Sequence, residues 1–189
     1  MSGSSRRATD PRRRSRRQRG QSVVELALGL PLMLALLFGT FNIGILIVDK
    51  VAVAYAARQG ARLAAVLGNG QAARLTTLQI DQNVCQAVLA SSSGLVYGSI
   101  TEVDVYQADA AGAASNGSFN PGVNPYDSYD GACNQRSQAF AASARVQTPP
   151  NEVSIGVWIK WQYATPAGLQ AVSLTLTEYC AMKTSPALS

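Results

Sequence analysis

The stretch RGQSVVELALGLPLMLALLFG, residues 19–39, decides the fold of the N-terminal part of this chain. It contains one acidic residue, Glu25, and the 23 residues that follow, 26–48, carry no charge. A helix of that length rises about 34 Å, which matches the roughly 30 Å hydrocarbon core of a bilayer. The sequence therefore predicts a transmembrane helix over residues 26–48, in which Pro31 and the glycines are tolerable.

The charges on the two sides of this segment predict its orientation. Residues 1–20 hold eight arginines and one acid, a composition that buries too little apolar area to fold, so we expect a disordered basic leader. The positive-inside rule places this leader in the cytoplasm and residues 50–189 outside. The chain is thus expected to be a single-pass protein of the cytoplasmic (inner) membrane with an extracytoplasmic C-terminal domain.

The helix is predicted to continue beyond the membrane. Residues 51–67, VAVAYAARQGARLAAVL, are rich in Ala, Leu and Arg, which are good helix formers. One helix should therefore cover residues 21–67 and end at Gly68, Asn69 and Gly70. A second helix is expected over residues 71–91, where several apolar residues fall near one face.

After this second helix the apolar period changes to two. Residues 100–107, 153–163 and 172–182 alternate apolar and polar side chains, which predicts three strands of an antiparallel sheet with one buried face. Residues 108–150 are expected to form a long polar loop. The predicted fold class is α+β, in which a long transmembrane helix precedes a head, residues 71–189, that packs a helix on a small antiparallel sheet.

Glu25 needs a physical reason, because a carboxylate at the edge of an apolar span costs free energy. If the chain is cut between Gly20 and Gln21, the new N-terminus is an ammonium group and Glu25 becomes the fifth residue. The two charges can pair along one helix, or the ammonium of one subunit can meet Glu25 of its neighbour and set the axial register. Without cleavage, Glu25 can instead reach water at the cytoplasmic edge.

The order of basic residues, Gly20, Glu25 and an apolar helix resembles the class III signal of type IV prepilins. Residues 20–64 resemble more specifically the TadE-like minor pilins (pseudopilins) of tight-adherence, Flp-type pilus systems. The matching features are Glu25 with Ala27, Leu30 with Pro31, Phe38 with Gly39, and the segment AARQGAR at residues 56–62. The chain departs from the pattern of major pilins at Gln21, where those usually carry Phe, which leaves N-methylation of the mature terminus open.

This resemblance implies a pilin-like structural protein that supports pilus assembly and adhesion. It implies cleavage after Gly20 by a prepilin peptidase, and partnership with the bilayer, other pilins and the assembly platform. Whether the protein enters the filament or stays in the membrane is left open. The alternative is an uncleaved single-pass membrane protein whose extracytoplasmic domain binds a ligand or a surface polymer.

Composition argues against enzymatic chemistry. The chain has no histidine and three cysteines, so zinc sites of the His/Cys type and triads with a histidine base are not expected. Asp104, Asp109 and Glu152 are scattered and form no convergent set of acids. We expect no cofactor, no metal site, no nucleic-acid partner and no small-molecule substrate.

Arg58, Gly60 and Arg62 form a candidate contact site on the predicted helix. The two arginines are four residues apart and point the same way, toward lipid head groups, an acidic partner or solvent. Gly60 between them permits the close approach of another helix.

The three cysteines are predicted to lie where disulfides persist, and they allow at most one internal bridge. Cys85 is on the apolar face of the second helix, Cys133 is in the polar loop and Cys180 is in the last strand. The sequence does not choose the pair, and three unpaired thiols remain an alternative.

Overall fold

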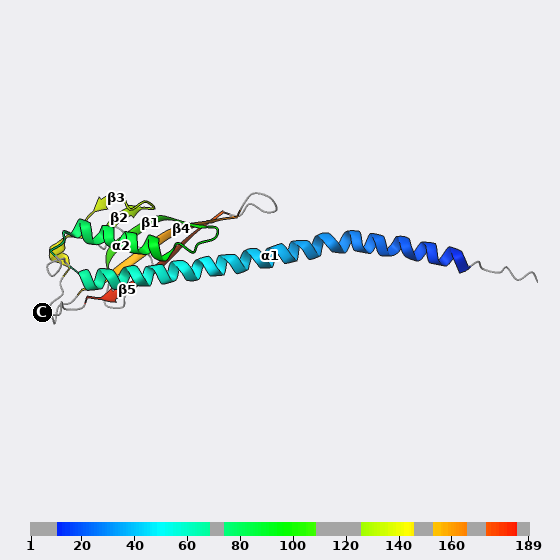
Figure 1. Ribbon diagram of the computed structural model, residues 1–189, viewed down its shortest axis with the longest axis horizontal. Helices are drawn as coiled ribbons and strands as arrows, with labels where there is room; N and C mark the ends of the chain where they lie inside the picture. The colour runs from blue at the N-terminus through cyan, green and yellow to red at the C-terminus, as the bar shows by residue number, and fades with distance from the viewer. Residues whose placement is uncertain (1–10, 69–73, 109–125, 146–152, 166–172, 185–189) are drawn as a thin grey trace, which may run out of the picture. The chain divides into compact units, whose positions relative to one another are not determined.

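The computed structural model describes residues 11–68, 74–108, 126–145, 153–165 and 173–184, with the backbone alone for residues 11–20. It divides into two compact units, residues 1–43 and 44–189. The elements appear in Figure 1. They are α1 (Pro11–Leu67), α2 (Thr77–Ser91), β1 (Gly98–Ala108), β2 (Tyr126–Asp130), β3 (Gln135–Gln138), a 3-10 helix (Ala142–Ala144), β4 (Ser154–Ala164) and β5 (Ser173–Lys183). The predicted α+β class is confirmed.

Helix α1 begins earlier than the sequence predicted. It starts at Pro11, so the expectation of a disordered leader is wrong for residues 11–20, while residues 1–10 lie outside the described part. Proline is favoured in the first helical turn and arginine is a good helix former. Extending a helix that the apolar segment has already nucleated costs little, because each added residue gains one hydrogen bond.

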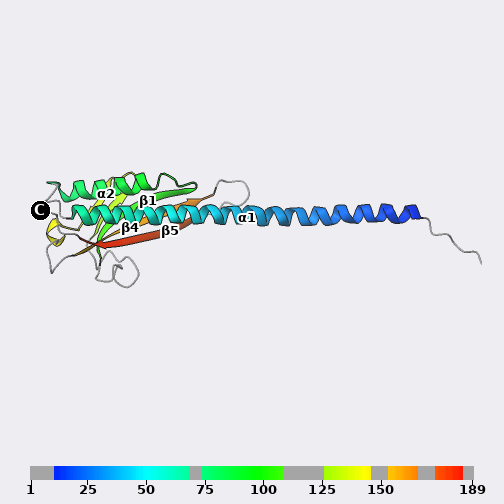
Figure 2. The same cartoon turned by 60° about the horizontal axis from the view of Figure 1, so that its bottom comes forward.

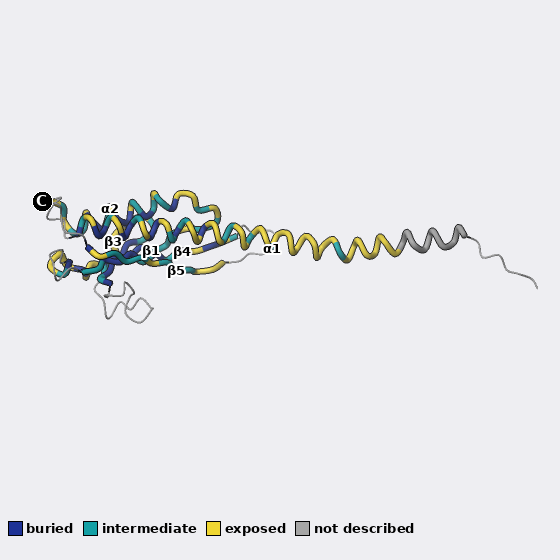
Figure 3. The backbone as a smooth tube through the Cα atoms, turned by 90° about the horizontal axis from the view of Figure 1, so that it is seen from below, coloured by how far each residue is buried: buried dark blue, intermediate teal, exposed yellow. Residues whose placement is uncertain are grey.

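The C-terminal end of α1 lies at Leu67, as predicted. Gly68 adopts a left-handed φ of 51° and its N–H donates to the Ala64 carbonyl at 2.8 Å, which satisfies a carbonyl that the helix leaves open. Asn69 and Gly70 lie outside the described residues. Between Gln21 and Leu67 the helix is long and apolar enough to cross a membrane, and its most apolar window contains no buried residue (Figure 3).

Helix α2 begins at Thr77, later than the predicted start at residue 71. Residues 71–73 lie outside the described part. A capping box fixes this start. The Thr76 hydroxyl accepts from the Gln79 N–H at 3.3 Å, and the Gln79 side-chain oxygen accepts from the Thr76 N–H at 2.9 Å. The Thr-x-x-Gln spacing was readable in the sequence. The predicted end at Ser91 is confirmed.

The sheet has five antiparallel strands in the order β3-β2-β1-β4-β5. The three predicted strands are present as β1, β4 and β5. The predicted loop 108–150 is wrong for residues 126–130 and 135–138, which form β2 and β3, and for the 3-10 helix Ala142–Ala144. These strands are short and polar, and β2 exists because it pairs with β1. Residues 109–125 and 146–152 of that loop lie outside the described part.

Both helices lie on one face of the sheet, where the core forms (Figures 1 and 2). Strand β4 turns its alternate residues inward, as its period of two predicted. Helix α1 contributes mainly small side chains to this core, and these allow its backbone to lie close to the sheet. The buried β4 and α1 residues include Ile155, Val157, Ile159, Trp161, Tyr163, Val53, Ala56, Ala57, Ala61 and Ala64.

Candidate processing site and helix interface

The predicted cleavage position lies inside α1. Gln21 and Glu25 are exposed, and the Gln21 Nε2 donates to the Glu25 Oε1 at 3.1 Å across one helical turn. In the intact chain the carboxylate is therefore paired with the side chain of residue 21. Cleavage before Gln21 would turn the backbone nitrogen of this residue into an ammonium group, one turn from the same carboxylate.

A helical scissile bond restricts access. In a helix interior, the carbonyl of each residue accepts a hydrogen bond from the N–H four residues on, so a peptidase must unwind the helix locally to reach the Gly20 carbonyl. Glycine lowers helix stability by about 1 kcal/mol relative to alanine. Unwinding the helix at Gly20 therefore costs less free energy than unwinding it at an alanine.

The apolar part of α1 is suited to a bilayer or to other helices. Its large apolar side chains between Val23 and Ile43 are exposed, whereas Ile45 and Leu46 are half-buried and pack against the core of the head. The Thr40 hydroxyl donates to the Leu36 carbonyl at 2.8 Å, so this polar group is satisfied within the helix. An apolar helix with internally satisfied polar groups can lie in hydrocarbon.

Asp49 has a structural role that the sequence reading missed. Its side chain is buried and accepts the backbone N–H groups of Val96 at 2.8 Å and Tyr97 at 3.0 Å. The next residue, Lys50, lies 3.6 Å from Glu178 of β5. These two residues tie α1 to the segment that enters β1 and to the last strand.

The structure separates Gly60 from the two arginines. Gly60 is buried, and a Cβ there would lie 2.6 Å from a methyl group of Val88, so glycine permits the contact between α1 and α2. The close approach that was predicted is thus made by a helix of the same chain. Arg58 and Arg62 are exposed on the opposite side of α1.

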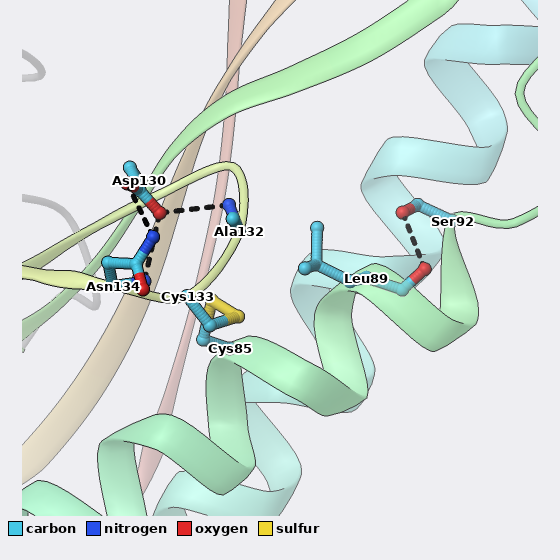
Figure 4. Close-up of a disulfide and its surroundings, with 7 residues drawn as sticks. All are labelled: Cys85, Leu89, Ser92, Asp130, Ala132, Cys133 and Asn134. Carbon is cyan, nitrogen blue, oxygen red and sulfur yellow. Dashed lines mark hydrogen bonds between the residues drawn. A yellow bond between two sulfur atoms is a disulfide. The ribbon is translucent and has the colours of Figure 1, made fainter.

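Two of the three cysteines form a disulfide, Cys85 with Cys133, which joins α2 to the turn between β2 and β3 (Figure 4). Cys180 is a free thiol, and burial raises its pKa. Cys133 has a left-handed φ of 61°. Asp130 holds the turn, because its side chain accepts from the N–H groups of Ala132 at 2.9 Å and Asn134 at 2.8 Å. The Asn134 side-chain amide also donates to Asp130, and these bonds lower the pKa of Asp130.

A buried ionic cluster includes Asp81, which lies one helical turn before Cys85 on α2. The sequence analysis placed none of the cluster's members together. The Arg145 guanidinium donates to both oxygens of Asp81, at 2.7 and 2.6 Å, and to Asp127 at 2.9 Å. The other Asp127 oxygen accepts from the N–H groups of Ala139 and Phe140. All three charged side chains are fully buried, so the cluster joins α2, β2 and the segment before β4.

The cluster contains one more carboxylate than cations. Burial raises the pKa of Asp81 to about 7, opposed by Arg145 and reinforced by Asp127. The hydrogen bonds of the cluster all connect elements of the head, which is typical of a structural rather than a catalytic group. Among the described residues, no group of three His, Cys, Asp or Glu side chains could hold a metal ion.

Of the three scattered acids, one lies in the described part of the chain. Asp109 and Glu152 lie outside the described residues. Asp104 is buried on β1, where burial raises its pKa to about 7.

Residues 20–62 match the sequence model of the family described as TadE-like protein. The match includes Gly20, Gln21, Glu25 and the Arg58–Arg62 segment, and it confirms the resemblance to the TadE-like family. The class III signal and cleavage after Gly20 stay predictions. It ends within α1, before α2 and the sheet. No curated protein and no solved structure matches the chain.

Proposed function

Because residues 20–62 place this chain in the TadE-like family, we propose that it is a minor pilin that supports assembly of a tight-adherence (Flp-type) pilus. Family membership makes it a component associated with such a pilus. The observation that carries the finer role is that the matched residues are one continuous helix with an exposed apolar surface.

The proposed anchor is the apolar part of α1, residues 26–48. The arginine-rich leader stays in the cytoplasm and the head, residues 71–189, lies outside the cytoplasmic membrane. The Cys85–Cys133 disulfide supports this orientation, because disulfides persist in oxidising compartments.

A separate prepilin peptidase cleaves the bond between Gly20 and Gln21. Removing the leader deletes the eight arginines and leaves an ammonium group at the N-terminal end of α1. Glu25 then lies near the positive end of the helix dipole, where a carboxylate is stabilising. In the assembled state, the ammonium of one subunit pairs with Glu25 of its neighbour and sets the axial register.

The protein acts as a structural component rather than an enzyme. Its charged side chains are used to join elements of the head, as in the Asp81–Arg145–Asp127 cluster and the Asp49 contacts. The chemistry that the proposal requires is cleavage by another protein.

The test is the N-terminal residue and intact mass of the protein isolated from membranes of its natural host. The proposal expects a chain that starts at Gln21. The variant Gly20→Val should accumulate at full length, because the larger side chain blocks the site. Gly29→Val is the matched control, since the open space around Gly29 accommodates a side chain, and it should be processed normally. Full-length native protein would favour the alternative, an uncleaved binding protein.

Glu25 is tested separately by Glu25→Gln, which keeps the shape and removes the charge. This variant should be cleaved as efficiently as the native chain but should assemble poorly, measured as pili per cell. Normal piliation with uncharged residue 25 would contradict the register role.

A further inference from the structure

One side of α1 within the head remains exposed. We define the Arg58–Arg62 face as Val51, Tyr55, Arg58, Arg62 and Val66. Val51, Tyr55 and Val66 are 63%, 54% and 59% exposed, although they are large apolar side chains. The opposite side of the same helix is buried against α2 and the sheet.

The spacing of this face fits a partner helix. Its members follow one another at four, three, four and four residues, which keeps them on one line along the helix axis. Such a row is the ridge that packs into the groove of a second helix.

The face carries two positive charges, and among the described residues Arg58 acts on the Cys180 thiol of β5, where it opposes the rise in pKa. Ion pairs among the described residues involve Lys50, Arg145 and Lys160, and none involves Arg58 or Arg62. Two arginines in an apolar row therefore complement a surface that carries carboxylates.

We propose that the Arg58–Arg62 face binds a helix of a different membrane-anchored protein, which presents two carboxylates about one turn apart. This inference rests on the proposed function, since a shared membrane places both helices at the same level. The carboxylates pair with Arg58 and Arg62, and apolar side chains of the partner cover Val51, Tyr55 and Val66.

Lipid head groups do not fit this face. At a rise of 1.5 Å per residue, Arg58 and Arg62 lie about 15 and 21 Å beyond Val48, the last residue of the predicted span. The polar layer on each side of the hydrocarbon core is about 5–8 Å thick. Arg62 therefore lies well beyond the head groups.

The α1 helix of a second copy does not fit either. In the described part of α1 the acidic residues are Glu25 and Asp49, and Asp49 is buried and bonded to the chain that enters β1. A second copy at the same membrane level would bring its own Arg58 and Arg62 to the contact, where like charges repel.

The test is photo-crosslinking from position 55 of the full-length protein in membranes of its natural host. Replacing Tyr55 by benzoylphenylalanine places the reactive group in the middle of the face. The expected adduct joins residue 55 to a helix of a different protein that carries two acids one turn apart. Mass spectrometry identifies the joined peptides.

Charge reversal provides the decisive comparison. Arg58→Glu with Arg62→Glu should reduce the adduct at least about tenfold, because two attractions become repulsions. Arg74→Glu with Arg136→Glu is the matched control, since both residues are exposed and the change in net charge is the same; it should leave the adduct unchanged. Changing the two partner acids to lysine should restore the adduct in the reversed protein.

An adduct with a second copy, an adduct with lipid, no adduct, or an adduct indifferent to charge reversal would each overturn the inference. The N-terminal residue is measured in the same samples, so a failure of the proposed function is distinguished. A chain that starts at Gln21 but gives no expected adduct would contradict this inference alone. A chain that retains its leader would contradict the proposed function itself.

Discussion

The Cys85–Cys133 disulfide is predicted to contribute a large share of the stability of the head. The two residues are separated by 48 positions in the sequence. Closing a loop of this length lowers the entropy of the unfolded chain enough to stabilise the fold by about 4 kcal/mol. Because domains of this size are stable by roughly 5–15 kcal/mol, removing the link should take away a large share.

The perturbation is Cys85→Ala with Cys133→Ala in the full-length protein, studied in detergent by urea titration. Trp161 is fully buried in the core beside the helices, so its fluorescence reports unfolding of the head. With a urea slope of about 2 kcal/mol per molar, a loss of about 4 kcal/mol moves the midpoint down by about 2 M. Cys133 already has a positive φ in the native chain, so alanine inherits that conformation and adds no new strain.

Two controls isolate the cross-link. The native protein treated with a thiol reductant should unfold near the midpoint of the double variant. Cys180→Ala retains the disulfide and should lose less than about 1 kcal/mol, since Cys180 is only partly buried. A double variant that loses less than about 1 kcal/mol, or as little as Cys180→Ala, would refute the loop-closure reasoning.

Other predictions concern the buried charges and the helix contact, all measured by the same urea titration. Arg145→Leu leaves two buried carboxylates without a cation and should cost about 3–5 kcal/mol. Since burial raises the folded-state pKa of Asp81 to about 7, the unfolded chain loses its proton first as pH rises above about 4. The free energy of unfolding should therefore fall between about pH 4 and 7, and Asp81→Asn should flatten this slope, leaving the part due to Asp104, whose pKa is raised to the same extent. Gly60→Ala should destabilise the head by about 1–3 kcal/mol through overpacking, whereas Gly29→Ala, with open space around it, should not.

Local sequence patterns correctly predicted those helices and strands that form because of their own residues. The apolar run after Glu25 and the Ala-rich segment after it predicted one helix, because helix formation depends on neighbours along the chain. Strand β4 was predicted because its alternating side chains all face one core. Residues 11–20 were wrongly expected to be disordered, since composition was judged without the helix that follows them.

Strands β2 and β3 show where local reading fails. Strand β2 has five residues and β3 has four, and neither shows a period of two in apolar side chains. Their hydrogen bonds are supplied by β1, which pairs with β2 through partners such as Val103 and Tyr129. A short polar strand of this kind is specified by its neighbour in the sheet.

The sequence by itself determined the anchor helix, the fold class and the family segment around Gly20 and Glu25, because those signals depend on residues that are close in the chain. Only the tertiary structure decided that Cys85 pairs with Cys133 and that Arg145 joins Asp81, 64 residues away. It also decided that Gly60 faces inward while Arg58 and Arg62 face outward. Each of these outcomes depends on which distant elements pack together. The sequence around a charged residue or a cysteine does not identify its partner, because the two come within bonding distance only when the chain packs.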